Sequence, residues 1–256
     1  MSLLHSFYCW GAVGVILGST LFFMLFGIDN WRILACFWAL IPLYNIVNFA
    51  TCPIEPIVQD SEGMSMKQLF GNKVFWLFLI LMVAAGASES TMAQWASAFA
   101  EASLHVDKTI GDLIGPCGFA FCMGLGRLWY GKKGQNLDLT SYMVGAGALT
   151  VAAYLMASLV PIPFISLAGC MISGLAVGIM WPGSISITSA RIPQGGTALF
   201  ALLALAGDAG GTFGPSLVGL CTGAGDNNIQ NGILAATIFP VILIVCLLAI
   251  RRIKAK

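Results

Sequence analysis

The sequence predicts an all-α membrane protein whose apolar helices cross a lipid bilayer about eight times. Of its 256 residues, 58% are hydrophobic and only 9% are charged, whereas a soluble domain carries about 25% charged residues. The mean hydropathy of +0.89 leaves too few polar side chains to cover a soluble surface, so lipid is the expected solvent. The apolar runs are long and continuous, which argues against a β-barrel built from short alternating strands.

Eight apolar runs are long enough to cross the hydrocarbon core, which needs roughly 20 residues in a helix. They cover residues 3–27, 31–49, 74–99, 110–130, 139–160, 164–190, 197–222 and 232–250. The segment 53–73 between the second and third runs is too polar to span. We therefore expect a connecting loop there.

The basic residues divide unequally between the two sides of the membrane in this topology. Ten of the 12 Lys and Arg residues fall on the side of the N-terminus, and only Arg32 and Lys108 fall on the other. Cytoplasmic connections are enriched in Lys and Arg, so we expect a multi-pass protein of the cell inner (plasma) membrane with both termini in the cytoplasm. The same count places Arg127 in a cytoplasmic connection.

A glycine pattern, GxxGxxxG, recurs in the first and seventh runs: Gly11, Gly14 and Gly18, then Gly207, Gly210 and Gly214. Each pair is 196 residues apart, and an Asp-Asn pair follows both runs, at 29–30 and 226–227. Either small residues recur by chance as packing seams, which are common in membrane helices, or the chain contains a parallel repeat of six helices. A repeat implies one complete six-helix half preceded by two helices of another half, with four helices missing before Met1.

Four segments resemble parts of a known family. They are LLHSFYCWGAVGVILGS (3–19), GASESTMAQWASAFAE (86–101), GRLWYGKKG (126–134) and AGDAGGTFGP (206–215). They are similar to the fifth helix, the seventh helix, the 8–9 connection and the eleventh helix of the major facilitator superfamily, within its fucose-permease-like group. No acidic residue lies in the 14 positions before Arg127, which departs from the family's usual pattern for the inter-helix charge contact at this connection.

The resemblance implies a division of the chain into three parts. Residues 1–52 would be the last two helices of the N-terminal bundle, and 53–73 the cytoplasmic loop between the halves. Residues 74–256 would then form the complete C-terminal six-helix bundle.

Six side chains within the apolar runs are candidates for substrate binding or proton coupling: Glu89, Asp208, Gln94, Trp95, Asn45 and Trp181. A carboxylate in hydrocarbon must face a cavity, find a partner or be protonated. Glu89, in the middle of the third run, therefore either lines a transport path or only fixes the packing of a neighbouring helix. Asp208 is either a coupling or substrate-contact carboxylate or a group that bonds to backbone loosened near Pro215.

The other four candidates have weaker support. Gln94 and Trp95 offer the amide and ring that bind sugars, although Trp95 could also be an interface tryptophan. Trp181 begins a Trp-Pro-Gly sequence that should break the sixth run, either beside a cavity or as an ordinary proline kink. Asn45 lies deep in the second run and could face a central cavity.

The sequence therefore predicts a secondary transporter that moves a small polar solute by alternating access, with a sugar implied only by the resemblance. The expected partners are the lipid bilayer, the solute and a coupling proton or cation, without nucleic acid. A membrane-embedded enzyme usually places His and acids together near one face, and His5 and His105 fall on opposite sides of the membrane, so we expect no enzyme activity and no catalytic residue. The eight cysteines show no close metal pairing, and we expect no metal or cofactor. The alternative is a truncated remnant whose cavity lacks half its wall, and on that view the isolated chain should transport nothing.

Overall fold

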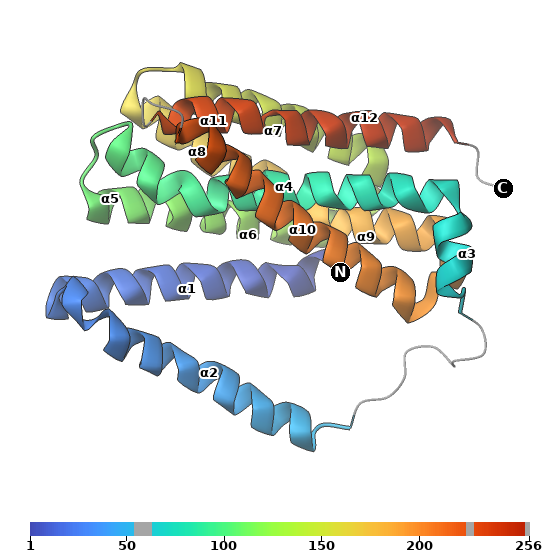
Figure 1. Ribbon diagram of the computed structural model, residues 1–256, viewed down its shortest axis with the longest axis horizontal. Coiled ribbons are helices and arrows are strands. Elements are labelled where there is room, and N and C mark those ends of the chain that lie inside the picture. The colour runs from blue at the N-terminus through green and yellow to red at the C-terminus, as the bar shows by residue number, and fades with distance from the viewer. Residues whose placement is uncertain (54–62, 224–227, 254–256) are drawn as a thin grey trace.

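The computed structural model describes residues 1–53, 63–223 and 228–253. Over these residues the chain is helical and has no strand, and eight of its helical segments are long and apolar enough to cross a membrane (Figure 1). Each segment matches one of the eight apolar runs to within a few residues. The prediction of an all-α membrane protein with about eight crossings is therefore confirmed.

The first two crossings are α1 (Ser2–Phe26) and α2 (Trp31–Thr51), with η1 (Ile28–Asn30) between them, and the short α3 (Met66–Gly71) follows. Three crossings have one long helix each: α4 (Lys73–Ala102), α7 (Leu139–Leu159) and α10 (Gly196–Thr222). Three crossings are interrupted. The fourth consists of α5 (Lys108–Asp112), η2 (Leu113–Cys117) and α6 (Gly118–Lys133). The sixth consists of α8 (Pro163–Val177) and α9 (Met180–Arg191), and the eighth of α11 (Ile229–Ala236) and α12 (Ile238–Arg252). The turns η3 (Gly134–Asn136) and η4 (Pro193–Gly195) precede α7 and α10.

A proline accounts for each of the three interruptions. Proline has no amide hydrogen, and its ring clashes with the carbonyl four residues before it. The prolines are Pro116, Pro182 and Pro240, and the residues four positions earlier, at or next to the interruptions, are Asp112, Gly178 and Ala236. The break predicted from Trp-Pro-Gly is therefore present, about one turn before the proline itself.

Side-chain caps fix several helix starts, and Asp138 caps α7. Its Oδ2 accepts a hydrogen bond from the amide of Ser141 at 2.9 Å, which satisfies one of the unpaired amides at a helix start. Hydrogen bonds from the side chain and the amide of Ser141 hold the pKa of Asp138 below its usual range. The ionised carboxylate is therefore the form that stabilises this end of the helix.

Replacing Asp138 by Ala should lower the free energy of unfolding by about 1 kcal/mol at neutral pH, because a helix cap is lost. Since the folded-state pKa is lowered, the wild-type cap contributes above the unfolded-state pKa and is lost as the pH falls through the folded-state value. The difference between wild type and variant should therefore shrink in acid, as measured by thermal unfolding in detergent. Asp29→Ala, which removes an exposed acid that caps no helix, is the control; an equal loss in both variants would contradict the capping role.

Helix α4 lies at the centre of the bundle and contacts α8, α9, α10 and α12. Its side chains Phe75, Phe78, Leu81 and Met82 are fully buried. The hydroxyl of Tyr154 in α7, also fully buried, donates to the carbonyl oxygen of Ser88 at 2.7 Å. This bond fixes α4 next to its one mid-span acid.

The closest helix contact is between α4 and α10, where backbone meets backbone. A Cβ on Gly86 would overlap the carbonyl oxygen of Gly207, and a Cβ on Gly210 would overlap that of Val83. Only glycine allows helices to approach this closely. The seventh-run glycine pattern is therefore a packing seam in this structure.

The matching glycines of α1 are in a different environment. Gly11 and Gly14 have no atom within 4 Å of a built Cβ, and a Cβ on Gly18 would lie 3.3 Å from the ring of Trp38. The second Asp-Asn pair, 226–227, lies outside the described residues. The internal repeat therefore stays a prediction.

Helices α1 and α2 lie to one side of the other helices (Figure 1). Helix α1 packs mainly on α6, whereas α2 makes its few contacts with η1 and α1. Trp38 of α2 donates from its ring nitrogen to Ser19 Oγ at 3.1 Å. The division at 1–52 and 53–73 stays a prediction, and part of that connection, 54–62, lies outside the described residues.

Candidate functional site

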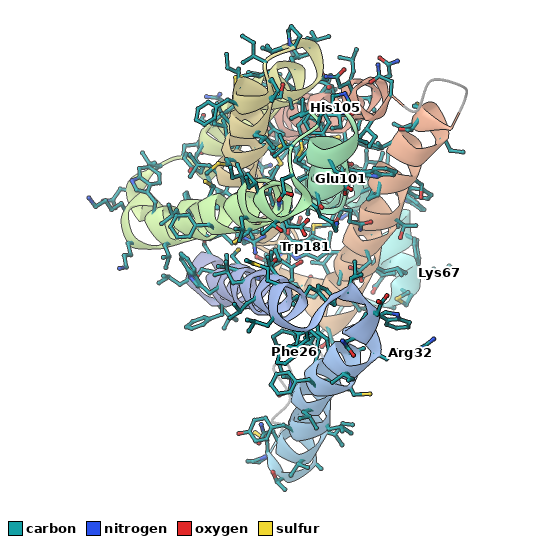
Figure 2. The ribbon with its side chains drawn as sticks, turned by 90° about the vertical axis from the view of Figure 1, so that its left-hand side faces the viewer. Phe26, Arg32, Lys67, Glu101, His105 and Trp181 are labelled. Atoms are coloured by element: carbon teal, nitrogen blue, oxygen red, sulfur yellow. The ribbon has the colours of Figure 1, made fainter. Side chains whose placement is uncertain are left out.

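A cavity of about 320 Å³ opens between α1, α4, α6, α9 and α10. Its polar and charged lining comes from His5, Tyr8, Glu89, Ser90, Arg127 and Asp208. Gly86 and Trp181 complete the wall, and Trp181 lies near the middle of the molecule in Figure 2. Of the six candidates from the sequence, the cavity brings together Glu89, Asp208 and Trp181.

An ion pair joins two walls of the cavity. Arg127 Nη2 lies 2.9 Å from Glu89 Oε2, and the two side chains are 2% and 14% exposed. Glu89 is therefore partnered, as an acid within a membrane span must be if it stays charged. Glu89 also lines the cavity, and its second carboxylate oxygen, Oε1, has no hydrogen bond within the described residues.

The rest of the Arg127 guanidinium is bound to backbone. Its Nε donates to the carbonyl oxygen of Gly178 at 2.9 Å, and its Nη1 donates to that of His5 at 3.0 Å. The Gly178 carbonyl would normally accept from the amide four residues later, but that residue is Pro182, which has none. Arg127 thus takes the place of the missing amide at the break between α8 and α9.

Arg127 also holds the start of α1. Its Nη1 lies 3.3 Å from Cys9 Sγ, and its own carbonyl accepts a hydrogen bond from Ser2 Oγ at 2.8 Å. One side chain on α6 therefore contacts α1, α4 and the α8–α9 break. The other ion pairs among the described residues, those of Lys108 with Glu101 and Asp112, join more exposed side chains.

The placement of Arg127 in a cytoplasmic connection was wrong. Helix α6 continues to Lys133, so Arg127 lies well inside it and is buried. A count of Lys and Arg near span ends treats such a residue as part of the loop. The missed signal is local: Leu125 before Arg127 and Leu128 and Trp129 after it continue the apolar run, so this charge needed a partner as much as Glu89 did.

Asp208 lines the same cavity from the middle of α10. Its side chain is exposed and makes no hydrogen bond or ion pair within the described part of the chain. Its neighbour Gly207 leaves the space that the ring of Trp181 fills. Trp181 and Asp208 thus belong to adjoining walls.

Gln94, Trp95 and Asn45 do not reach the cavity. Gln94 is exposed on α4, because five residues from Glu89 is about 1.4 turns and so a different face. Trp95 donates from its ring nitrogen to the Pro215 carbonyl oxygen at 3.0 Å and so links α4 to α10. Asn45 is exposed on α2, whose main contacts are with η1 and α1, and it is not among the residues that line the cavity.

Besides Arg127, three further cavity side chains were not among the sequence candidates: His5, Tyr8 and Ser90. His5 lines the cavity, and its carbonyl oxygen accepts a hydrogen bond from Arg127. The ring of Tyr8 lies 5.8 Å from the Arg127 guanidinium carbon. Both residues lie in the first two turns of α1, and a position near the end of a helix gave no indication in the sequence that they line a cavity.

All eight cysteines are free, and no group of three His, Cys, Asp or Glu side chains is placed to hold a metal in the parts of the chain described. Comparison of the chain with protein-family models, with curated proteins and with solved structures found no match. The site must therefore be interpreted through its own chemistry.

Proposed function

We propose that the protein is a secondary transporter, or part of one, that moves a small polar solute across a membrane by alternating access. The observation that carries this proposal is the cavity of about 320 Å³ with charged walls, in a chain with eight apolar crossings. Ionisable groups inside membrane spans are costly and usually mark solute or proton pathways. The cavity has room for a small solute and little more.

The position of the helix break supports the same function. The carbonyl of Gly178 at the α8–α9 break is bound by Arg127, whose guanidinium also lines the cavity. In secondary transporters, discontinuous helices near the middle of the membrane typically form the solute site. The break and the charged cavity here share one side chain.

Family, substrate and orientation belong to this proposal as well. The four resembling segments favour the major facilitator superfamily, with residues 1–52 and 74–256 in different halves and a sugar as the family's implied solute. The basic residues favour cytoplasmic termini in the inner (plasma) membrane, since nine remain on that side against two once Arg127 is counted inside the bundle. Helices α1 and α12 run in opposite directions, α1 leftward from N and α12 rightward to C (Figure 1).

Replacing Glu89 by Ala or Gln should lower solute uptake by at least about tenfold, since one buried charge partner is lost from the cavity wall. Uptake of a panel of labelled small solutes is measured in cells that express the gene together with any coding sequence upstream of Met1. Membrane levels of each variant are matched by immunoblot. The control is Glu101→Gln, which removes an exposed acid that does not line the cavity and is 12 residues from Glu89 along α4; Glu101 is labelled in Figure 2.

Full uptake by both Glu89 variants would contradict a transport role for the cavity. The reading frame upstream of Met1 adds an independent test. Four further apolar spans in that frame are expected if the repeat is real.

A further inference from the structure

The cavity carries more negative than positive charge that a solute can reach. Arg127 is 2% exposed, and its guanidinium is bound to Glu89 and to the backbone of Gly178 and His5. It is therefore a fixed part of the wall, with its positive charge already matched by Glu89. Asp208 remains as a second acid with no partner among the described residues.

The Asp208 side chain is exposed and unpaired within the described residues, so its carboxylate is free to bind a proton or a cation that enters the cavity. The groups around it are suited to a cation. Glu89 Oε1 and the Asp208 carboxylate are hydrogen-bond acceptors, and the ring of Trp181 forms the adjoining wall. Aromatic faces attract cations through their ring electrons, most strongly for tryptophan.

An anionic solute is disfavoured by the same arrangement. The one arginine in the cavity has its Nε and both terminal nitrogens in hydrogen bonds. Binding an anion would require breaking the pair with Glu89 and would leave two acids facing it. A neutral solute would leave Asp208 without a counter-charge.

We propose that the solute of this cavity is a small organic cation, an amine or quaternary ammonium, held between the Asp208 carboxylate and the ring of Trp181. This inference rests on the proposed transport function and names the class of solute. Glu89 assists through its free oxygen while Arg127 holds it in place. The sugar implied by family resemblance is the competing outcome.

The test uses the protein together with any coding sequence upstream of Met1, in lipid nanodiscs, with choline as the probe. Binding of tritiated choline is measured by scintillation proximity, with unlabelled choline or 3,3-dimethylbutan-1-ol as competitor. The alcohol has the same shape with a carbon in place of the charged nitrogen. We expect choline to compete at least about tenfold better than the alcohol, because only it carries the charge that meets Asp208.

Variants locate the effect within the cavity. Asp208→Asn should weaken choline binding by about tenfold or more, whereas Asp208→Glu, which keeps the charge, should retain most of it. Trp181→Leu should weaken binding several-fold, and Trp181→Phe less, because phenylalanine keeps an aromatic face. Asp29→Asn, which removes an exposed acid outside the cavity, is the matched control, and thermal unfolding confirms that each variant is folded.

Absence of choline binding, equal competition by choline and the alcohol, or unchanged binding in folded Asp208→Asn would each overturn the cationic assignment. None of these results would remove the transport function, since a neutral solute could use the same cavity. Conversely, Asp208-dependent choline binding together with full uptake in both Glu89 variants would support the cation site and count against the proposed role of the cavity in transport.

Discussion

Replacing Arg127 by Met should lower the free energy of unfolding by about 3–5 kcal/mol, the usual loss when one partner of a buried ion pair is removed. The variant leaves Glu89 without its partner at 2.9 Å and the Gly178 carbonyl without a donor. It also removes the bond to the His5 carbonyl, which holds α1. The loss is measured by thermal or denaturant unfolding in detergent micelles.

The double variant Arg127→Met with Glu89→Gln separates the causes of this loss. It removes the uncompensated charge, so it should recover part of the stability, while the unpaired Gly178 carbonyl keeps the rest of the penalty. The control is Arg32→Met, which removes an exposed cation that lies over the ring of Trp31. Equal stability of Arg127→Met and Arg32→Met would refute the joining role of Arg127.

Adding one methyl group at the α4–α10 seam should be nearly as damaging. Gly86→Ala and Gly210→Ala each place a Cβ against a backbone carbonyl that cannot rotate away. The helices must then separate, and we expect a loss of about 3 kcal/mol in unfolding free energy, at the upper end for overpacked sites.

Gly14→Ala is the matched control, because it is the counterpart of Gly210 in the α1 pattern and has no atom within 4 Å of a built Cβ. It should change stability by no more than about 0.5 kcal/mol. Comparable losses of stability at Gly14 and Gly210 would contradict the packing role of Gly210, because they would show that the effect of alanine does not depend on the α4–α10 contact.

The crossings were predictable because lipid leaves the backbone few alternatives. A spanning segment must satisfy its hydrogen bonds internally, so a long apolar run implies a helix. The break near Pro182 was predictable for the same local reason, the missing amide. The way the helices pack against one another could not be predicted from the runs. Asn45 was a candidate for this reason, although the main contacts of α2 are with η1 and α1.

Cavity residues could be predicted from the sequence where a charged side chain in an apolar run required a cavity or a partner. Glu89 and Asp208 are acids in apolar surroundings, and both line the cavity. Gln94 lies outside the cavity because residues five apart on a helix are on different faces. Arg127 was missed because a rule about loop charges was applied to a residue inside a helix, so the partner of Glu89 went unrecognised.

The bond from Arg127 to the Gly178 carbonyl has a thermodynamic consequence. Where an ordinary helix would close this turn with its own amide, here the turn is closed by a side chain that also binds Glu89 and the His5 carbonyl. The angle between α8 and α9 and the charge state of Glu89 are therefore linked variables. Any ligand that draws Glu89 away from Arg127 also changes the free energy of bending at Gly178, and bending at Gly178 changes the affinity for that ligand by the same factor.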